Sequence, residues 1–394
     1  MSRSSTKLIQ SIDVVRGFSI LAVLCGHFTL VDPLRTPSWA WSLFLLLAAN
    51  GAYGVSTFFV ASGFLITRMI DGRNQEMFIA NKPLFYIRRA SRIFPTLALA
   101  GCIGILLFLH GGDRGGALAV TFKDPKADFG LLFWSSILLF FFNWLRIATE
   151  TANACYGLTW DVLWSLAIEE QFYIGYPFML SRLGTTKRLV RVLALVIVSG
   201  PAYRLAAAIV KPESFLLGFT SSFAAFDQLA IGVLSYIAWR DKWFARLPGF
   251  LRSSLPAIGV FLAGIAYVFA SLGSPVGRTW GPTVLATGIG LLFASGLDHP
   301  VFELAFWRPL KILGRASYEA YLFHGLVLYL LWPVLIGRNF LWAFSGYLIA
   351  VTTISTAVHL AFGEPAKKKL AAALQKLLGV KSAGPSIVPA GPAD

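Results

Sequence analysis

Charged residues are scarce in this chain, and acidic residues are scarcer than basic ones. Only 13% of the 394 residues are Asp, Glu, Lys or Arg, whereas a soluble chain is about one quarter charged. Apolar residues account for 56%, and the mean hydropathy is +0.68. The shortage of charge excludes a soluble protein and a soluble domain held by a single anchor. The sequence therefore predicts an all-α, polytopic membrane protein.

Cysteine is also scarce, with three residues, Cys25, Cys102 and Cys155. They lie in or near apolar segments without metal-like spacing, so the sequence supports neither a disulfide framework nor a metal site. The formal net charge of +15 could suit nucleic-acid binding, but most Lys and Arg residues lie in loops between apolar segments. We expect these charges to orient the protein in a lipid bilayer, and we expect no nucleic-acid partner.

The apolar segments are numerous and mostly long enough to cross a membrane. They run approximately over 12–31, 42–67, 94–109, 131–145, 162–181, 190–209, 222–239, 254–272, 280–297, 316–336 and 340–362. Segment 131–145 is shorter than the roughly 17 residues that a spanning helix needs. The position of the basic residues decides how this segment is interpreted.

If segment 131–145 does not cross, 24 of the 34 Lys and Arg residues fall on one side, which the positive-inside rule makes cytoplasmic. If it crosses, the basic loops after residues 181, 239 and 307 move outside. We therefore predict ten transmembrane helices, one short re-entrant or partly buried helix, and cytoplasmic N- and C-termini. The transmembrane domain is predicted to cover residues 1–366. Residues 367–394 are predicted to be a disordered tail, first basic and then rich in Pro and Gly.

The first apolar segment contains polar residues where hydrocarbon is expected. Arg16 and His27 are eleven residues apart, so on a helix they project from one face, about 16 Å apart along the axis. A charged group in the bilayer costs a few kcal/mol and usually faces a protein interior or a wet cavity. This helix is therefore predicted to form one wall of a polar site.

Two adjacent acidic residues occur in an aromatic-rich segment. Glu169 and Glu170 lie between Trp164 and Tyr173, at a predicted depth of about 10 Å below the outer surface. A buried carboxylate needs a partner. The cations of the first segment are the obvious candidates, so we expect the two segments to meet.

Other polar residues allow both a functional and a structural interpretation. Ser62 lies in a segment rich in Phe and small residues, which suits close helix packing as well as a place in a cavity wall. Arg88, Arg89 and Arg92 lie just before a span that is expected to begin near Pro95. Guanidinium groups bind phosphate oxygens, so a cytoplasmic phosphorylated donor could dock there, but anchoring by the positive-inside rule explains them as well.

The later segments give similar alternatives. Tyr321 and His324 lie one turn apart on the segment 316–336, where His324 fits a structural histidine better than a catalytic one. Asp227 and Arg204 are both placed near the outer ends of spans. We interpret these two residues as a structural ion pair.

Together these residues resemble membrane acyltransferase family 3, a family of integral-membrane O-acyltransferases. The resemblance covers about residues 10–367. It rests on D-x-x-R-G at 13–17, R-x10-H at 16–27, G-V-x-x-F-F-V-x-S-G-F at 54–64, R-x-x-R at 89–92, W-S-L-x-x-E-E-Q-F-Y at 164–173, S-Y-x-x-Y-L-x-H at 317–324 and E-P at 364–365. Each motif is weak alone, but six groups in this order, with the two overlapping motifs at 13–27 counted as one, are specific.

The resemblance implies transfer of an acyl group, usually acetyl, from cytoplasmic acyl-CoA to a hydroxyl of a cell-surface or exported carbohydrate. The protein would lie in the cytoplasmic (inner) membrane and use acyl-CoA as co-substrate, without a metal. The implied catalytic residues are His27, Glu169 and Arg16. Acyl-CoA would bind to Arg88, Arg89 and Arg92. The residues that would bind the substrate are Trp164, Glu170, Tyr173, Ser62, Tyr321 and His324.

In the mechanism that we expect, His27 is a general base or briefly carries the acyl group. Glu169 orients His27, and Arg16 stabilises negative charge in the same cavity. The alternatives are a multi-pass transporter of a polar or acylated solute and an O-succinyltransferase of a periplasmic or extracellular glycan. A lipid-linked-sugar glycosyltransferase is disfavoured because the first outer loop, 32–41, is short. The sequence leaves the acceptor and the oligomeric state open.

Overall fold

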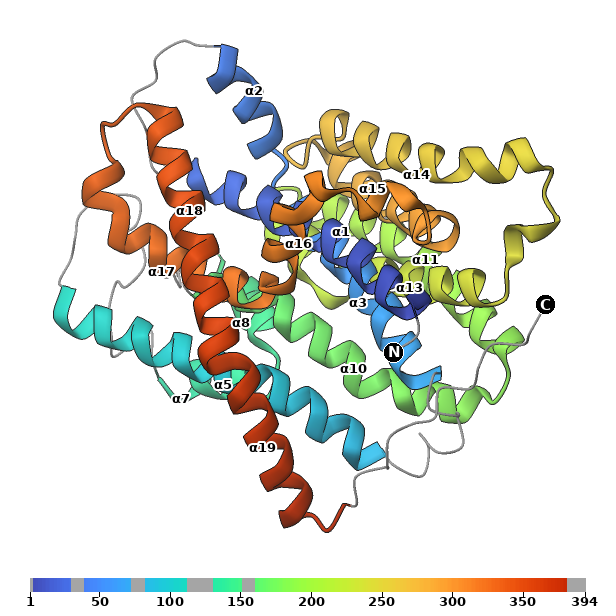
Figure 1. The fold of residues 1–394 in the computed structure, drawn as a ribbon, viewed down its shortest axis with the longest axis horizontal. Helices are drawn as coiled ribbons and strands as arrows, with labels where there is room; N and C mark the ends of the chain where they lie inside the picture. The colour runs from blue at the N-terminus through green and yellow to red at the C-terminus, as the bar shows by residue number, and fades with distance from the viewer. Residues whose placement is uncertain (1–2, 30–38, 72–81, 112–129, 151–159, 381–394) are drawn as a thin grey trace.

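The computed structural model describes residues 3–29, 39–71, 82–111, 130–150 and 160–380. Within these ranges the regular elements are all helices (Figure 1). Eight candidate spans are long and apolar enough to cross a membrane. The prediction of an all-α, polytopic membrane protein is thus confirmed. Cys155 and the first outer loop up to residue 38 lie outside the described residues.

The helices follow the predicted order along the chain. They are α1 (Arg3–Phe28), α2 (Trp39–Ala48), α3 (Tyr53–Asp71), α5 (Lys82–Gly111), α7 (Leu131–Leu138), α8 (Phe142–Ala148), α10 (Leu163–Leu183), α11 (Thr186–Val210), α12 (Phe215–Thr220), α13 (Ser222–Arg240), α14 (Gly249–Phe269), α15 (Pro275–Gly296), α16 (Arg308–Arg315), α17 (Ser317–Leu335), α18 (Phe340–Val358) and α19 (Glu364–Leu377). The eight candidate spans correspond to eight of the ten predicted ones. Helices α10 and α15 correspond to the other two, at 21 and 22 residues.

The predicted span 42–67 is two helices, α2 and α3, separated by a turn. Asn50 holds this turn, since its side chain donates to Tyr267 O at 2.7 Å and accepts from Leu272 N at 3.1 Å. A Cβ atom on Gly51 would lie 2.8 Å from Gly26 Cα, so the turn packs directly against α1. Hydrophobicity continues through the turn, which is why the sequence pattern missed it.

Helix α5 begins at Lys82, well before the predicted start near Pro95. Arg88, Arg89 and Arg92 therefore lie on a helix and not in a preceding loop. Pro95 is inside the helix, where its missing N–H removes one backbone hydrogen bond.

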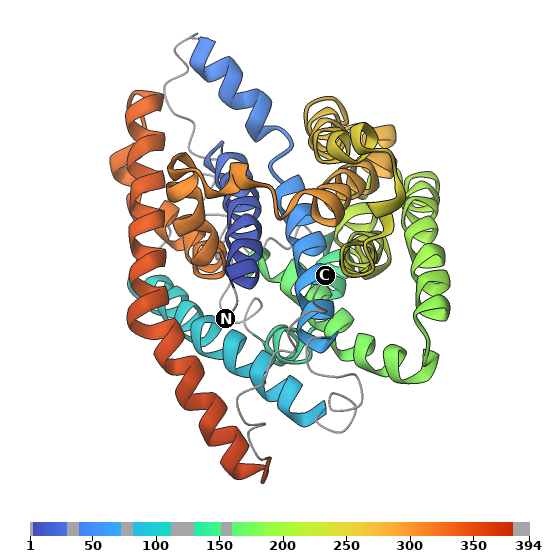
Figure 2. The same ribbon diagram turned by 45° about the vertical axis from the view of Figure 1, so that its right-hand side comes forward.

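Helix α18 continues through a π-helical turn, His359–Gly363, into α19, and Figure 2 shows them as one long column along one side of the molecule. The tail from residue 367 is therefore helical up to Leu377, contrary to the predicted disorder. Its Lys, Leu, Ala and Gln residues are strong helix formers, which explains the difference. Residues 381–394 lie outside the described part.

Segment 131–145 is broken into the short helices α7 and α8. Phe140, in the break, has a φ of 57°, and its carbonyl accepts a hydrogen bond from Gln171 Nε2 at 2.6 Å. Gln171 also donates to Asn143 Oδ1 at 3.0 Å. The break thus packs against the middle of α10. Helices of eight and seven residues are about 12 Å long or less, too short to cross a membrane.

Contacts between helix ends indicate which ends lie on the same side of the membrane. Arg240, at the end of α13, donates to Asp71, at the end of α3, at 3.0 Å. On the other side, Asn50 contacts Tyr267, near the end of α14. Both contacts agree with a topology in which segment 131–145 does not cross, because a crossing would put Asp71 and Arg240 on opposite sides.

Helix α3, which carries Ser62, packs closely against α13. A Cβ atom on Gly63 would lie 2.1 Å from Leu229 O, and one on Gly232 would lie 2.1 Å from Val60 O. Only glycine permits this approach, as the small residues of this segment predicted.

A buried ion pair joins α11 to α13. Arg204 Nη2 lies 2.9 Å from Asp227 Oδ2, and both side chains are fully buried. Arg204 also donates to Thr279 O at 2.8 Å. The predicted structural pair is thus confirmed.

Candidate active site

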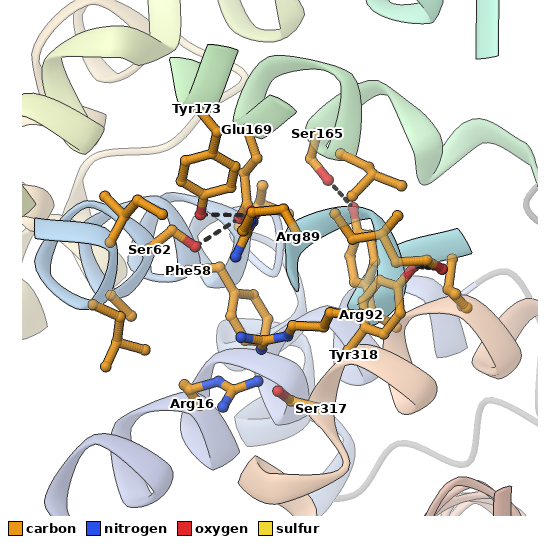
Figure 3. Close-up of a pocket in the computed structure, with 18 of the residues that line it drawn as sticks. Arg16, Phe58, Ser62, Arg89, Arg92, Ser165, Glu169, Tyr173, Ser317 and Tyr318 are labelled. Carbon is orange, nitrogen blue, oxygen red and sulfur yellow. Dashed lines mark hydrogen bonds between the residues drawn. The ribbon is translucent and has the colours of Figure 1, made fainter. Parts of the chain in front are cut away.

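Two neighbouring cavities lie among the helices that carry the motifs. The carboxylate cavity, about 980 Å³ including its open mouth, lies between α1, α3, α5, α10 and α17 and is lined by Arg16, Ser62 and Glu169 (Figure 3). The histidine cavity, about 1160 Å³ on the same measure, is lined by His27 and by residues of α2, α3 and the start of α10. Val55 and Tyr321 line both cavities, so these two side chains stand between them.

Glu169 is held by two hydroxyl groups in the carboxylate cavity. Its Oε1 accepts from Ser62 Oγ at 2.9 Å, and its Oε2 accepts from Tyr173 OH at 3.2 Å (Figure 3). Glu169 and Tyr173 are four residues apart on α10, so they share one face. Ser62 reaches them from α3. The structure thus places these three predicted residues together.

The partner of Glu170 comes from α5 and not from the first helix. Arg89 Nη2 lies 3.2 Å from Glu170 Oε1, and Glu170 is only 6% exposed. The Arg89 guanidinium also lies 3.7 Å from the centre of the Tyr173 ring. The expectation that a cation of α1 pairs with these acids was wrong, because α5 begins early enough to bring Arg89 to α10. Arg88 is half-buried and lines neither cavity.

The opposite end of the carboxylate cavity is cationic. Figure 3 shows Arg16, Arg92 and Ser317 near one another, with Phe58 between them and the Glu169 end. Arg16 lies 3.9 Å from Asp13, which Arg315 also contacts at 3.3 Å. No described carboxylate forms an ion pair with Arg92.

The start of α17 adds an unpartnered polar atom to this cationic end. Ser317 is 1% exposed, and in the described part of the protein its Oγ has no hydrogen-bond partner. No side chain caps the N-terminus of α17, where backbone N–H groups lack acceptors within the helix. The arrangement suits an anion, since guanidinium, hydroxyl and helix N-terminus all favour one.

His27 opens into the histidine cavity and not into the cavity that holds Arg16 and Glu169. The expectation of one shared cavity was wrong. Tyr321 intervenes, since its hydroxyl donates to Val162 O at 3.1 Å and pairs with Ser165 Oγ at 2.8 Å.

Trp164 and Asp161 also line the histidine cavity. Asp161 forms an ion pair with Arg146 of α8. Trp164 thus lies near His27, as a predicted substrate-binding residue should.

His27 is oriented by His324 and not by Glu169. His27 Nδ1 lies 2.9 Å from His324 Nε2, and the two rings are inclined by 26°. His324 is fully buried and lines neither cavity. The role expected for Glu169 was wrong because Glu169 lies in the other cavity.

Sequence reasoning missed several residues that line the cavities. They are Asp161, Ser165 and Tyr318. Ser165 and Tyr318 stand inside motifs quoted above, which was the available signal. Among the described residues no three His, Cys, Asp or Glu side chains converge in a way that could hold a metal ion.

The fold and the two cavities define a multi-pass membrane protein with a polar site enclosed among its helices. The acyltransferase family 3 model, described as an acyltransferase domain, matches residues 9–360, and the chain therefore belongs to this family. The resemblance that the motifs predicted is confirmed.

Curated relatives carry related names. The chain is 27% identical over 354 residues to the peptidoglycan O-acetyltransferase OatA of Listeria monocytogenes, covering 85% of this chain and 51% of that protein. It is 27% identical over 359 residues to the putative peptidoglycan O-acetyltransferase YrhL of Bacillus subtilis, with the same coverage. The chain thus spans about half the length of these relatives. No solved structure matches it.

Proposed function

We propose that this protein is an O-acyltransferase of the cytoplasmic membrane. It moves an acyl group, most simply acetyl, from cytoplasmic acyl-CoA to a hydroxyl of a cell-surface or exported glycan. The supporting observation is the pair of cavities that meet at Val55 and Tyr321. Two reactants that approach from opposite sides of a membrane need such an arrangement.

We assign the two cavities to sides of the membrane from the helix ends that line them. Arg16 lies at the middle of α1, and His27 lies at its C-terminal end. Arg89 and Arg92, near the start of α5, and Ser317, at the start of α17, line the carboxylate cavity, and the positive-inside rule favours the cytoplasmic side for these helix ends. The histidine cavity then belongs to the outer half, where a glycan would arrive.

The cationic end of the carboxylate cavity is the proposed contact for the donor's phosphates. Arg16 and Arg92 supply positive charge, and the buried Ser317 hydroxyl supplies a hydrogen bond that no described residue uses. Arg89 is a weaker candidate than the sequence indicated, because its charge is already paired with Glu170.

The proposed chemistry occurs where the two cavities meet. His27 removes the proton from the acceptor hydroxyl as its oxygen attacks the thioester carbonyl, and the CoA sulfur leaves as a thiolate that takes up a proton. The acyl end of the donor must pass Tyr321 to reach the histidine cavity. Phe58 and Leu322, which line the donor side, help exclude water.

Transfer by the purified protein in proteoliposomes tests this proposal. Acetyl-CoA labelled in its acetyl group is supplied on one face and a peptidoglycan or polysaccharide fragment on the other; label is expected in the glycan. Succinyl-CoA in a parallel assay tests the acyl preference. Movement of solute without consumption of acyl-CoA would instead indicate a transporter.

The matched variants are His27→Ala and His299→Ala. His299 is exposed and lines neither cavity. Loss of a general base should lower transfer by about 100-fold or more in His27→Ala, whereas His299→Ala should match the wild type. Equal rates in the two variants would remove His27 from the mechanism.

A further inference from the structure

We propose that His324 is a positioning residue that holds His27 in the tautomer whose Nε2 atom is an unprotonated base. The assignment of His27 as a base rests on the proposed function; the tautomer itself does not. Nothing in the sequence motifs distinguishes this role from that of a structural histidine.

The contacts of His324 fix its own hydrogen. Its Nδ1 lies 2.7 Å from Tyr321 O and 3.2 Å from Ala320 O, both in the preceding turn of α17. Carbonyl oxygens only accept hydrogen bonds, so Nδ1 of His324 carries the hydrogen. His324 is fully buried, and no described carboxylate pairs with it, which disfavours a charged imidazolium. The neutral ring therefore has a bare Nε2.

That bare nitrogen determines the state of His27. His324 Nε2 lies 2.9 Å from His27 Nδ1, and two lone pairs at that distance would repel. The hydrogen must therefore be on Nδ1 of His27, which donates it to His324. A neutral His27 then has its lone pair on Nε2. This atom has no hydrogen-bond partner among the described residues, and the side chain lines the histidine cavity.

The charged neighbours do not offer a competing partner. Arg146 of α8 is a charged side chain that acts on His27 electrostatically, and Asp161 neutralises it in an ion pair. Asp161 and Trp164 line the same cavity from the start of α10, and Tyr321 closes it from α17. Nε2 of His27 is thus an unprotonated nitrogen in the lining of this cavity, and the contact of Nδ1 with His324 sets that state.

Nitrogen-15 NMR of the full-length protein in lipid nanodiscs tests the tautomer directly. The five histidines are labelled, and His27→Gln identifies the His27 signals. We expect wild-type His27 to show a protonated Nδ1 and an unprotonated Nε2. In His324→Phe, which removes the acceptor but keeps an aromatic ring, His27 should shift toward the Nε2–H tautomer. In His324→Gln, whose amide oxygen can accept the same hydrogen bond, the wild-type tautomer should largely persist.

Kinetics provide the second measurement. With the labelled-acetyl assay, His324→Phe should lower kcat at least tenfold and leave KM for the donor within about twofold. His324→Gln should lower kcat several-fold less than His324→Phe does. Thermal unfolding shows whether each variant is folded. If His324→Phe is not folded, the wild-type and His324→Gln spectra still show which nitrogen of His27 carries the hydrogen.

A protonated Nε2 on wild-type His27, or a His27 tautomer that is unchanged in folded His324→Phe, would overturn the proposal. A protein with the expected tautomer but no acyl transfer would refute the proposed function and leave the positioning contact intact. The two failures are therefore distinguishable.

Discussion

The guanidinium carbon of Arg89 lies 3.7 Å from the centre of the Tyr173 ring. The same guanidinium pairs with Glu170, so one arginine of α5 is held by two residues of α10. This contact ties the arginine cluster to the acidic motif, and it makes Arg89 a structural residue as much as a binding one. The distinction can be measured.

Arg89→Met should destabilise the protein by about 3 kcal/mol, because it leaves the carboxylate of Glu170 buried without its partner. The double variant Arg89→Met with Glu170→Gln should recover part of that loss. Chemical unfolding in detergent measures both. If the double variant lost the sum of the unfolding free energies that the two single variants lose, the two side chains would not interact.

Arg92→Gln should raise KM for the acyl-CoA donor about tenfold or more, because a charge-assisted hydrogen bond to phosphate contributes about 1.5–3 kcal/mol. Arg188→Gln is the control, since Arg188 is exposed at the start of α11 and lines neither cavity. Initial rates at varied acetyl-CoA concentration give KM. An unchanged KM in Arg92→Gln would place the phosphates elsewhere.

Tyr321→Ala should join the carboxylate and histidine cavities, because Tyr321 lines both. Water then reaches the thioester, so hydrolysis of acetyl-CoA should rise relative to transfer to the glycan. Tyr321→Phe keeps the ring and loses only the bonds to Val162 and Ser165, so it should raise hydrolysis much less. The ratio of free acetate to acetylated glycan reports the difference; the same ratio in both variants would argue against a partition.

Gly63→Ala should be strongly destabilising, because its Cβ would lie 2.1 Å from the backbone oxygen of Leu229. Gly175→Ala in α10 is the matched control, since nothing lies within 4 Å of a Cβ there. The control should stabilise the helix by up to about 1 kcal/mol. Unfolding midpoints that fall equally in both variants would contradict the close approach of α3 to α13.

The sequence predicted the helical class and most of the polar residues that line the cavities, but it predicted neither their partners nor how they divide between two cavities. Hydrophobic length locates a span because about 20 apolar residues cross a bilayer. It does not register a turn such as the one at Asn50, which is held by contacts with α14. Spacing placed Arg16 and His27 on one face, yet it carried no information about Tyr321, which arrives from a helix some 300 residues later. Pairings such as that of Arg89 with Glu170 depend on helix packing, which no single segment encodes.

The position of Tyr321 in the lining of both cavities has a consequence for the cell as a whole. The two cavities that adjoin there differ in their charged lining: arginines line the carboxylate cavity, whereas Asp161 lines the histidine cavity. Under the proposed function, a polyanionic carrier is attracted to the first cavity and not to the second. A cell could then raise the concentration of the donor without blocking the entrance used by the glycan.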